Sequence, residues 1–286
     1  MDRWLVLDGG GWVGGLVALP GGSPAASRGF ELAYVGAEGR EQRESLVAAS
    51  GVRFELVTPV RPFPSYRGQR SNSGLWWCAT TGGHVGYESW LERDQLTLLD
   101  FDQAIVGIAS QPFWLFWQDE GRRRSHAPDF FARRVDGTGV VVDVRPEGRV
   151  RARDAAAFAA TRRACAAVGW DYRLVHEPEA VRMANVRWLA GYRHPRCRRE
   201  AVVAAAPVVF AEPVALMHGA ARLGDPLATL PTVFHLLWWA GCTLTLRCRC
   251  RSCRWWRRWT VEQRAGSAAR GRPGAVRWSG GDGRWL

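Results

Sequence analysis

One run of seven residues limits the folds that are open to this chain. Residues 140–146 read Val-Val-Val-Asp-Val-Arg-Pro, which is almost continuous in apolar, β-branched side chains. Such a run predicts a strand buried on both faces, as in sheets that helices cover on each side. Asp143 and Arg145 are unusual there, because charged side chains are rarely buried unless they are paired. The run therefore predicts a covered central strand that carries either a structural ion pair or a functional site.

The patterns around this run predict alternating helices and strands. We expect helices at 87–102, 151–169 and 178–192, strands at 104–110, 113–117, 140–146 and 170–175, and a further hairpin arm at 126–135. Residues 119–124 and 136–139 are expected to form turns. The order helix, three strands, helix, strand, helix predicts an α/β domain with a mixed sheet flanked by helices.

Composition shifts divide the chain into five expected segments. With 286 residues the chain is long enough for one large domain or two ordinary ones. The expected segments are a poorly ordered Gly- and Pro-rich start (1–29), an N-terminal β extension with alternating strands (30–75), the α/β domain (76–195), a small helical segment (200–241) and a basic tail (242–286). A helix at 229–241, with Thr232 as its N-cap, is expected in the fourth segment.

The charge of the chain points to a polyanionic partner. All 39 basic residues are Arg, the formal net charge is +12 and the pI is about 10.3. GC-rich coding DNA explains the choice of Arg over Lys, while binding to nucleic acid explains part of the excess positive charge. The candidate contacts to the DNA backbone are Arg67, Arg70, Arg122, Arg123 and Arg124. The alternative for both groups is a solvated basic loop.

Cysteine use and hydropathy favour a cytoplasmic protein that does not enter a membrane. The seven Cys are odd in number, which argues against a disulfide framework and fits a reducing compartment. The longest apolar run, 201–211, is too short to span a bilayer and contains Pro207. We therefore expect a cytoplasmic, nucleoid-associated location.

The tail after residue 241 differs in kind from the rest. It holds eleven Arg, five Trp and four Cys against two acids. Its Cys-x-Cys-x-x-Cys spacing at 248–253 suggests a zinc site only loosely, because no matching second pair follows. A basic arm for nucleic acid is a second interpretation. We favour a third, in which GC-rich DNA is read out of frame and the tail is disordered.

Three residues near the central strand could carry chemistry. Asp143 and Arg145 are two apart on a strand and so share a face, and the hairpin could bring Asp129 beside them. Two carboxylates and a cation suit Mg²⁺-dependent hydrolysis of a phosphodiester, since carboxylates hold a hard cation and the cation stabilises charge on phosphate. The alternative is a structural ion pair between Asp143 and either Arg145 or Arg151.

The helix before the strands supplies a third acid. Glu92 shares a helix face with Leu96 and Leu99, which are expected to pack inward, and Glu88 lies one turn earlier on that face. A carboxylate on a buried face needs a partner. Taken alone, Glu92 is a half-exposed residue at the edge of the apolar stripe. Taken with Asp129 and Asp143, it completes a set of three carboxylates. His126 borders this set, and we interpret it as an ordinary loop histidine.

This set of residues resembles the PD-(D/E)XK nuclease superfamily, and more closely the TnsA-like endonuclease subunit of heteromeric Tns-type transposases. The resemblance covers about residues 30–240 and rests on YESWLERDQLTLLDFD, GIASQPFWLFW, HAPDFFARR and VVVDVRP. It implies a restriction-endonuclease-like fold and a catalytic set of Glu92, Asp129, Asp143 and Arg145. The three acids would hold Mg²⁺, with Mn²⁺ as a substitute. Arg145 stands where the superfamily usually has Lys.

The resemblance also implies a function and partners. TnsA-like subunits nick double-stranded DNA at the 5′ ends of a transposon, together with a DDE-type transposase and an AAA+ regulator. Their winged-helix-like C-terminal domain would correspond here to residues 200–241. Two alternatives stay open: a catalytically inactive DNA-binding or assembly subunit with the same fold, and a stand-alone restriction or repair nuclease. Arg145 bears on the first, because Arg cannot act as a base near neutral pH.

Overall fold

The structure is a computed structural model of the whole chain, and it describes residues 29–63, 72–212 and 214–239. It also describes the backbone of four short strands outside these ranges, β1 (Val6–Leu7), β13 (Thr243–Arg247), β14 (Arg258–Glu262) and β15 (Trp278–Ser279). The chain forms two compact units. The larger unit consists of residues 14–100 and 104–179, and the smaller unit of 1–13, 101–103 and 180–286.

A mixed four-stranded sheet forms the centre of the larger unit. Its strands are β6 (Ile105–Ser110), β9 (Phe130–Arg134), β10 (Gly139–Val144) and β11 (Asp171–Val175), in the order β11-β10-β9-β6. β10 runs parallel to β11 and antiparallel to β9. All six residues of β10 are buried, as the β-branched run predicts. The sheet therefore places Asp143 in the middle of the unit.

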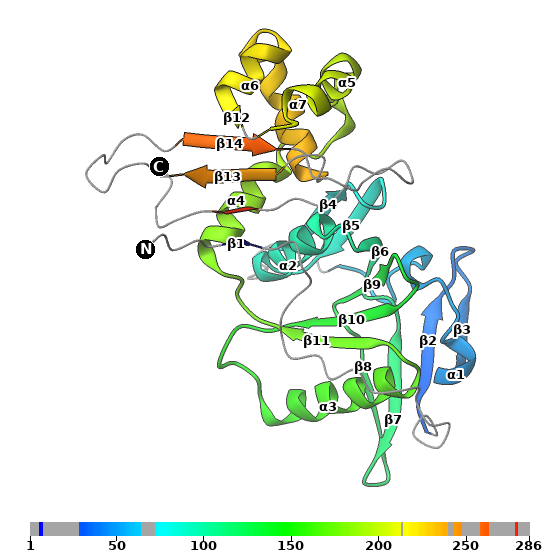
Figure 1. Cartoon of the computed structure of the whole chain (residues 1–286). Coiled ribbons are helices and arrows are strands. Elements are labelled where there is room, and N and C mark those ends of the chain that lie inside the picture. The colour runs from blue at the N-terminus through cyan, green and yellow to red at the C-terminus, as the bar shows by residue number, and fades with distance from the viewer. Residues whose placement is uncertain are drawn as a thin grey trace. The chain divides into compact units, whose positions relative to one another are not determined.

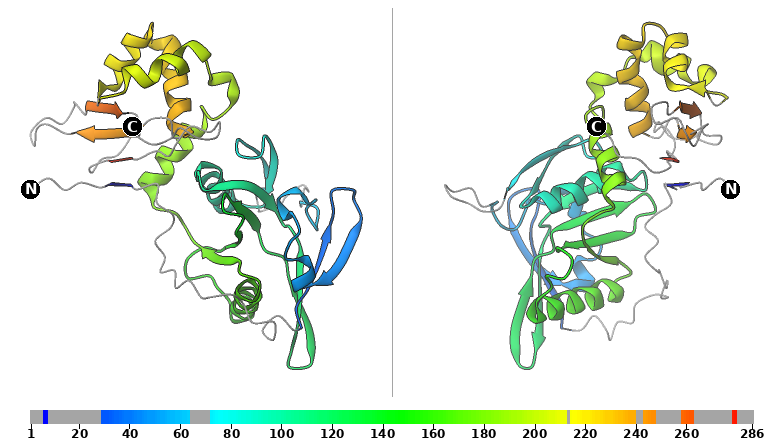
Figure 2. Two further views of the ribbon diagram at one scale, coloured as in Figure 1. Left: turned by 45° about the vertical axis from the view of Figure 1, so that its right-hand side comes forward. Right: turned by 90° about the vertical axis from the view of Figure 1, so that its left-hand side faces the viewer.

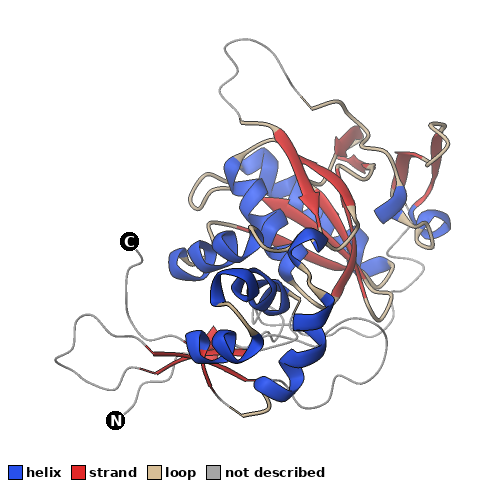
Figure 3. Cartoon of the chain, turned by 90° about the horizontal axis from the view of Figure 1, so that it is seen from above, coloured by secondary structure: helices blue, strands red, loops and turns tan. Residues whose placement is uncertain are grey.

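Two helices lie on opposite sides of this sheet (Figure 1). They are α2 (Trp90–Phe101) and α3 (Ala152–Ala167). α3 ends at Ala167, two residues before the predicted stop at Gly169, whose φ of 72° suits a residue without a side chain. Figure 3, in which helices are blue and strands red, shows the strands and the helices that flank them. The expected α/β fold class, restriction-endonuclease-like with a mixed sheet flanked by helices, is confirmed.

A second sheet joins the N-terminal strands to a long hairpin. Its order is β3-β2-β7-β8, from β2 (Glu31–Val35), β3 (Glu41–Ser45), β7 (Trp114–Asp119) and β8 (Arg122–His126). The prediction of a turn over 119–124 was wrong: only Glu120 and Gly121 turn, both with positive φ, and the three arginines belong to β8. The β7–β8 hairpin extends beyond α3 (Figures 1 and 2).

The N-terminal strands share one core with the central sheet. Between them lie α1 (Leu46–Ala49) and the short 3₁₀ helix η1 (Phe54–Leu56). The Phe54 ring is fully buried, and its centroid lies 4.9 Å from Phe113, 5.4 Å from Phe131 and 5.6 Å from Trp170. Aromatic pairs at such distances stabilise the fold by more than the burial of their surface area alone. The segment that we expected as a β extension is therefore packed into the α/β unit rather than attached to it.

A buried carboxylate fastens a further hairpin to α2. The hairpin consists of β4 (Gly74–Cys78) and β5 (Gly83–Tyr87). Asp100, 1% exposed, accepts hydrogen bonds from Trp76 Nε1 (2.9 Å), Cys78 Sγ (3.2 Å) and the backbone N–H groups of Ala79 (3.1 Å) and Thr80 (2.8 Å). These donors solvate the buried charge in place of water.

The elements of the smaller unit are α4 (Ala180–Ala190), η2 (Pro195–Cys197), α5 (Glu200–Val209), β12 (Val214–Ala215), α6 (Leu216–Leu223) and α7 (Pro226–Trp238), followed by β13, β14 and β15. From α5 to β14 they follow the order helix, strand, helix, helix, strand, strand. β14 pairs antiparallel with both β12 and β13. Residues 200–241, which the resemblance assigns to a winged-helix-like domain, contain α5, β12, α6 and α7. That assignment stays a prediction. Figure 1 shows α5, α6 and α7 packed together, with α6 in contact with β12 and β14.

Two local predictions for this unit differ from the structure. The N-cap of α7 is Asp225, whose carboxylate accepts the N–H of Leu227 at 3.2 Å, whereas Thr232 lies inside the helix and donates to the carbonyl of Cys197. β13 and β14 also lie in the tail that we expected to be disordered. The tail cysteines lie outside the described residues. No helix in the described part of the chain has the length and apolarity to cross a membrane.

Candidate active site

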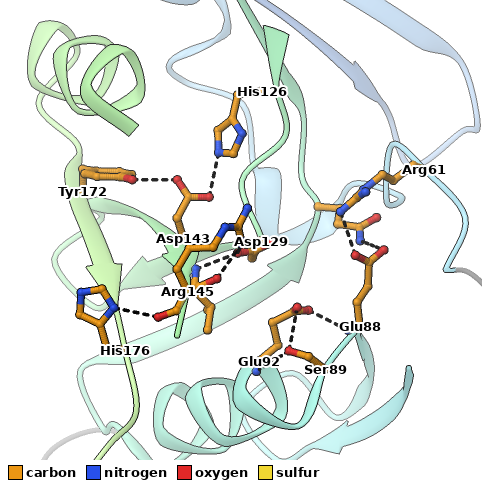
Figure 4. Close-up of polar contacts among 12 residues, drawn as sticks. Arg61, Glu88, Ser89, Glu92, His126, Asp129, Asp143, Arg145, Tyr172 and His176 are labelled. Atoms are coloured by element: carbon orange, nitrogen blue, oxygen red, sulfur yellow. Dashed lines mark hydrogen bonds and ion pairs between the residues drawn. The ribbon is translucent and has the colours of Figure 1, made fainter. Parts of the chain in front are cut away.

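Asp143 is fully buried on β10 and is held by two side chains from other strands. Its Oδ1 lies 2.8 Å from Nε2 of His126 on β8, and its Oδ2 accepts a hydrogen bond of 2.8 Å from the hydroxyl of Tyr172 on β11 (Figure 4). Burial, followed by the charge of Asp143, raises the pKa of Tyr172, so its hydroxyl stays a donor. Asp143 is therefore oriented by neighbours and is not paired with Arg145 or Arg151, the two structural partners considered above.

Asp129 lies beside Asp143 because of the hairpin register. Phe130 on β9 pairs with Val142 on β10, so the next position brings Asp129 level with Asp143. Asp129 is 5% exposed, and its Oδ2 accepts the backbone N–H of Val144 at 2.7 Å and Nη1 of Arg145 at 3.1 Å. The expected approach of Asp129 to the central strand is thus present, with Arg145 on its carboxylate.

Arg145 lies one residue beyond the end of β10. Its Nη1 also donates to the carbonyl of Val144 at 2.6 Å, and its guanidinium carbon lies 5.3 Å from the centre of the Phe158 ring on α3. The ring of His126 packs on the same Phe158 at 5.7 Å. Phe158 therefore contacts both Arg145, the partner of Asp129, and His126, the partner of Asp143. The Arg145 side chain is 31% exposed.

Glu92 is placed by the start of α2. Its backbone N–H donates to Ser89 Oγ at 3.2 Å, while its carboxylate accepts from Ser89 Oγ at 3.0 Å and from the N–H of Glu88 at 2.7 Å. This reciprocal pattern is a variant of the capping box, in which a Ser and a Glu three residues later satisfy free N–H groups of the first turn. Glu92 therefore has a structural task in addition to the role predicted for it.

The three acids influence one another. Burial raises the pKa of Asp129 well above its usual value, the charges of Asp143 and Glu92 raise it further, and Arg145 lowers it. Burial also raises the pKa of Glu92, against which the hydrogen bonds from Glu88 and Ser89 act. Negative charge around Asp129 is thus only partly compensated, which makes the place attractive to a cation.

Residues 102–177 match a family model described as TnsA-like endonuclease N terminal. Over these residues the chain is similar to TnsA-like endonucleases, and we call this part the nuclease domain. No curated protein matches the chain. The match contains Asp129, Asp143 and Arg145, which the β9–β10 hairpin brings together, whereas Glu92 precedes it. Glu92 stays a predicted member of the site, and its charge acts on Asp129 while Arg145 acts on Glu92.

The donor set of the nuclease domain fits a hard divalent cation by its chemistry. All three acids offer carboxylate oxygens, the ligands that Mg²⁺ prefers. Their present arrangement does not close around one point, because the described residues contain no group of three or more His, Cys, Asp and Glu side chains that could hold a metal ion. The raised pKa values of Asp129 and Glu92 indicate the charge that such a cation would offset.

A second polar cluster borders the site of the nuclease domain and was not predicted. Glu88 lies before α2 rather than on it, and its carboxylate accepts from Arg61 Nη2 at 3.0 Å and from Gln111 Nε2 at 2.8 Å. Gln111 is 2% exposed and has a φ of 47°, a strained value for a residue with a side chain. Its N–H donates to the carbonyl of Asp129, so Gln111 connects Asp129 to the residues around Glu88.

The candidate DNA contacts of the nuclease domain divide between two faces of β8. Arg122, Arg124 and His126 are two residues apart along β8, so their side chains share one face of the strand. On β7 the residues paired with Arg124 and His126, Trp117 and Leu115, are both buried. Arg123 lies on the other face, where its guanidinium carbon is 4.5 Å from the Phe116 ring centre and Nη2 is 3.9 Å from Glu31. Arg67 and Arg70 lie outside the described residues.

Proposed function

We propose that this chain is a DNA endonuclease subunit of a Tns-like transposase that hydrolyses phosphodiester bonds at the 5′ ends of a transposon. One observation carries the proposal: in a TnsA-like nuclease domain, Asp129 lies next to Asp143, and its pKa is raised by burial and then by the charges of Asp143 and Glu92. A domain that served only as a scaffold would gain nothing from unfavourable buried charge.

Each residue has a proposed task. Glu92, Asp129 and Asp143 hold a divalent cation, Mg²⁺ or Mn²⁺. When bound, such an ion lowers the pKa of a water molecule and polarises the phosphoryl group. His126 and Tyr172 keep the carboxylate of Asp143 in place. Arg145 binds the scissile phosphate, since its fork of N–H groups matches phosphate oxygens and stays charged at all working pH values.

Double-stranded DNA is the proposed substrate, and β8 is the proposed contact. Arg122 and Arg124 are exposed, and they continue the strand face on which His126 reaches Asp143. At about 3.4 Å per residue, Arg124 stands about 7 Å and Arg122 about 14 Å along the strand from His126, a range that covers neighbouring phosphates of a duplex. Arg124 has only a long ion pair, 3.7 Å to Asp119, which leaves it available to DNA.

We also propose two protein partners for this chain. A subunit that cuts only one strand at each transposon end needs a second nuclease, which we propose to be a DDE-type transposase. The predicted winged-helix-like part of the smaller unit, residues 200–241, is the proposed contact for an AAA+ regulator. The chain would act at the nucleoid in the cytoplasm.

One observation favours a second candidate, an inactive assembly subunit with the same fold. Arg145 cannot accept a proton near neutral pH, so it cannot replace a lysine base if the reaction requires one. An inactive subunit would still bind DNA, but addition of Mg²⁺ would produce no nicks. A stand-alone restriction or repair nuclease would cut without a transposase partner.

The test is the loss of nicking in Asp129→Ala. The full chain is incubated with supercoiled plasmid that carries the transposon ends, with and without the partner proteins, in Mg²⁺ or in chelator. We expect nicks in Mg²⁺ from the wild type and from Asp136→Ala, an exposed aspartate in the next turn, and none from Asp129→Ala. Metal-dependent nicking by Asp129→Ala at the wild-type rate would exclude the proposed site. A wild type that binds the ends and never nicks them would favour the assembly subunit.

A further inference from the structure

Arg145 lies against a carboxylate that the proposed function assigns to a metal ion, that of Asp129. Oδ2 of Asp129 accepts only one hydrogen bond besides that of Arg145, from the N–H of Val144. The same Nη1 of Arg145 is held by the carbonyl of Val144. The guanidinium is thus fixed on Asp129 by two acceptors, and it supplies the positive charge nearest to that buried carboxylate.

We propose that Arg145 is the internal counter-ion of Asp129 and competes with a divalent cation for this carboxylate. The inference rests on the proposed function, because it concerns the same site. It adds a second task for the residue that stands in the lysine position. In the absence of metal, Arg145 keeps the cluster of acids folded; in the presence of metal, Arg145 must leave Asp129.

The charges around Asp129 require a counter-ion of this kind. Asp143 and Glu92 both act unfavourably on Asp129, and Arg145 is the basic side chain that acts favourably. Arg145 also acts favourably on Glu92. A carboxylate buried among other acids is costly unless a cation is next to it. The described side chains are not gathered into a metal site. The Arg145 guanidinium is therefore the cation that lies next to Asp129 in this arrangement.

The position of Arg145 permits it to leave. Its side chain is 31% exposed, and its guanidinium lies over the Phe158 ring. The guanidinium can therefore shift away from Asp129 while it keeps its cation–π contact with this ring. Arginine remains charged, so it is repelled by a divalent ion on Asp129 and keeps its capacity for phosphate.

The experiment measures metal binding without DNA, so that it does not depend on nicking. Mn²⁺ is titrated into the full chain by calorimetry, using the wild type, Arg145→Met and Arg145→Lys. The matched control is Arg134→Met, which removes a comparable ion pair, that of Arg134 with Asp171 on the same sheet. We expect Arg145→Met to bind Mn²⁺ about tenfold more tightly than the wild type, because a like charge has been removed. Arg145→Lys and Arg134→Met should bind as the wild type does.

A melting curve completes the test and guards against unfolded variants. Arg145→Met should melt at a lower temperature than the wild type in chelator and gain more from Mn²⁺. If Arg145→Met does not fold, Arg145→Gln takes its place in the same comparison. A neutral variant that is folded and binds Mn²⁺ no better than the wild type overturns the inference, as does tighter binding by Arg145→Lys.

The outcomes separate this inference from the proposed function. If the wild type binds Mn²⁺ and Asp129→Ala does not, the site stands, and the Arg145 variants alone decide whether the guanidinium competes. If neither the wild type nor the neutral variants bind Mn²⁺, the proposed metal site fails and the inference fails with it.

Discussion

Asp100 and Asp129 are both buried carboxylates of the larger unit, yet their surroundings are opposite. Asp100 is 1% exposed and accepts hydrogen bonds from two side chains and two backbone N–H groups of the β4–β5 hairpin. Asp129 is 5% exposed, accepts one backbone N–H and one guanidinium, and has two further acids as neighbours. Donors surround the first, and charges of the same sign crowd the second. The difference separates a carboxylate that holds the fold together from one to which we assign a role in the proposed chemistry.

The largest effect on stability is expected at Asp100. Asp100→Ala would leave several buried donors without an acceptor, at a cost of about 1–3 kcal/mol for an unsatisfied group. We expect the free energy of unfolding, measured with urea, to fall by about 3 kcal/mol. A change below about 1 kcal/mol would mean that the hairpin finds other acceptors, and the contrast with Asp129 would then be lost.

Asp129 should behave in the opposite way. Asp129→Asn removes the charge that its neighbours oppose, so the free energy of unfolding in chelator should stay level or rise by about 1 kcal/mol, although nicking is lost. Urea unfolding next to Asp100→Asn, which should be destabilised, checks both halves of the comparison. A loss of stability at Asp129 as large as that at Asp100 would make Asp129 a structural residue.

The surroundings of Asp129 should also make the stability of the fold depend on pH. The pKa of Asp129 is raised in the folded state, so the folded chain holds this proton over a range where the unfolded chain has released it. The stability gained from this protonation is present below the usual pKa of 3.8 and is lost as the pH rises through the raised value. Unfolding in chelator across this range should give a falling slope for the wild type and a flatter one for Asp129→Asn. Equal slopes would contradict the crowding described around Asp129.

The smallest effects are expected among the three arginines of β8, where the same division between structure and function recurs. Arg123 contacts the Phe116 ring and pairs with Glu31. Arg122 and Arg124 lie on the other face of the strand, the face of His126. We expect Arg122→Ala and Arg124→Ala each to weaken DNA binding severalfold and to reduce the slope of log K against log salt by about 1. Arg123→Ala should leave that slope unchanged. Fluorescence anisotropy over a salt series measures both, and three equal losses would remove the assignment of faces.

The central part of the fold could be predicted because its signals are local. The β-branched run 140–146, the Ala-rich helix with Gly169 after it and the position of Asp129 after a proline each depend on neighbouring residues. β8 was missed because Gly-Arg-Arg-Arg has the composition of a turn, and its strand conformation depends on pairing with β7. β13 was missed although Thr-Leu-Thr-Leu does alternate, because the Arg- and Trp-rich residues around it hid the pattern.

The rest of the site depends on register, which single residues do not reveal. His126 and Tyr172 meet Asp143 from two different strands, so their contact follows only once the order β11-β10-β9 and the β7–β8 pairing are known. The strained backbone of Gln111 has no sequence signal at all. Ser89 and Glu92 are an exception: Ser-x-x-Glu is a readable start of a helix, and it also explains why Glu92 is held firmly.

Phe54 has a consequence for anyone who wishes to transplant the TnsA-like domain into another protein. The matched stretch, residues 102–177, contains Phe113, Phe131 and Trp170 but not the ring that fills the space between them. A minimal fragment cut at those boundaries would expose an aromatic hollow and would tend to aggregate rather than fold. Any portable version of the domain has to begin upstream of β2, so the smallest transferable piece is set by packing and not by the motif.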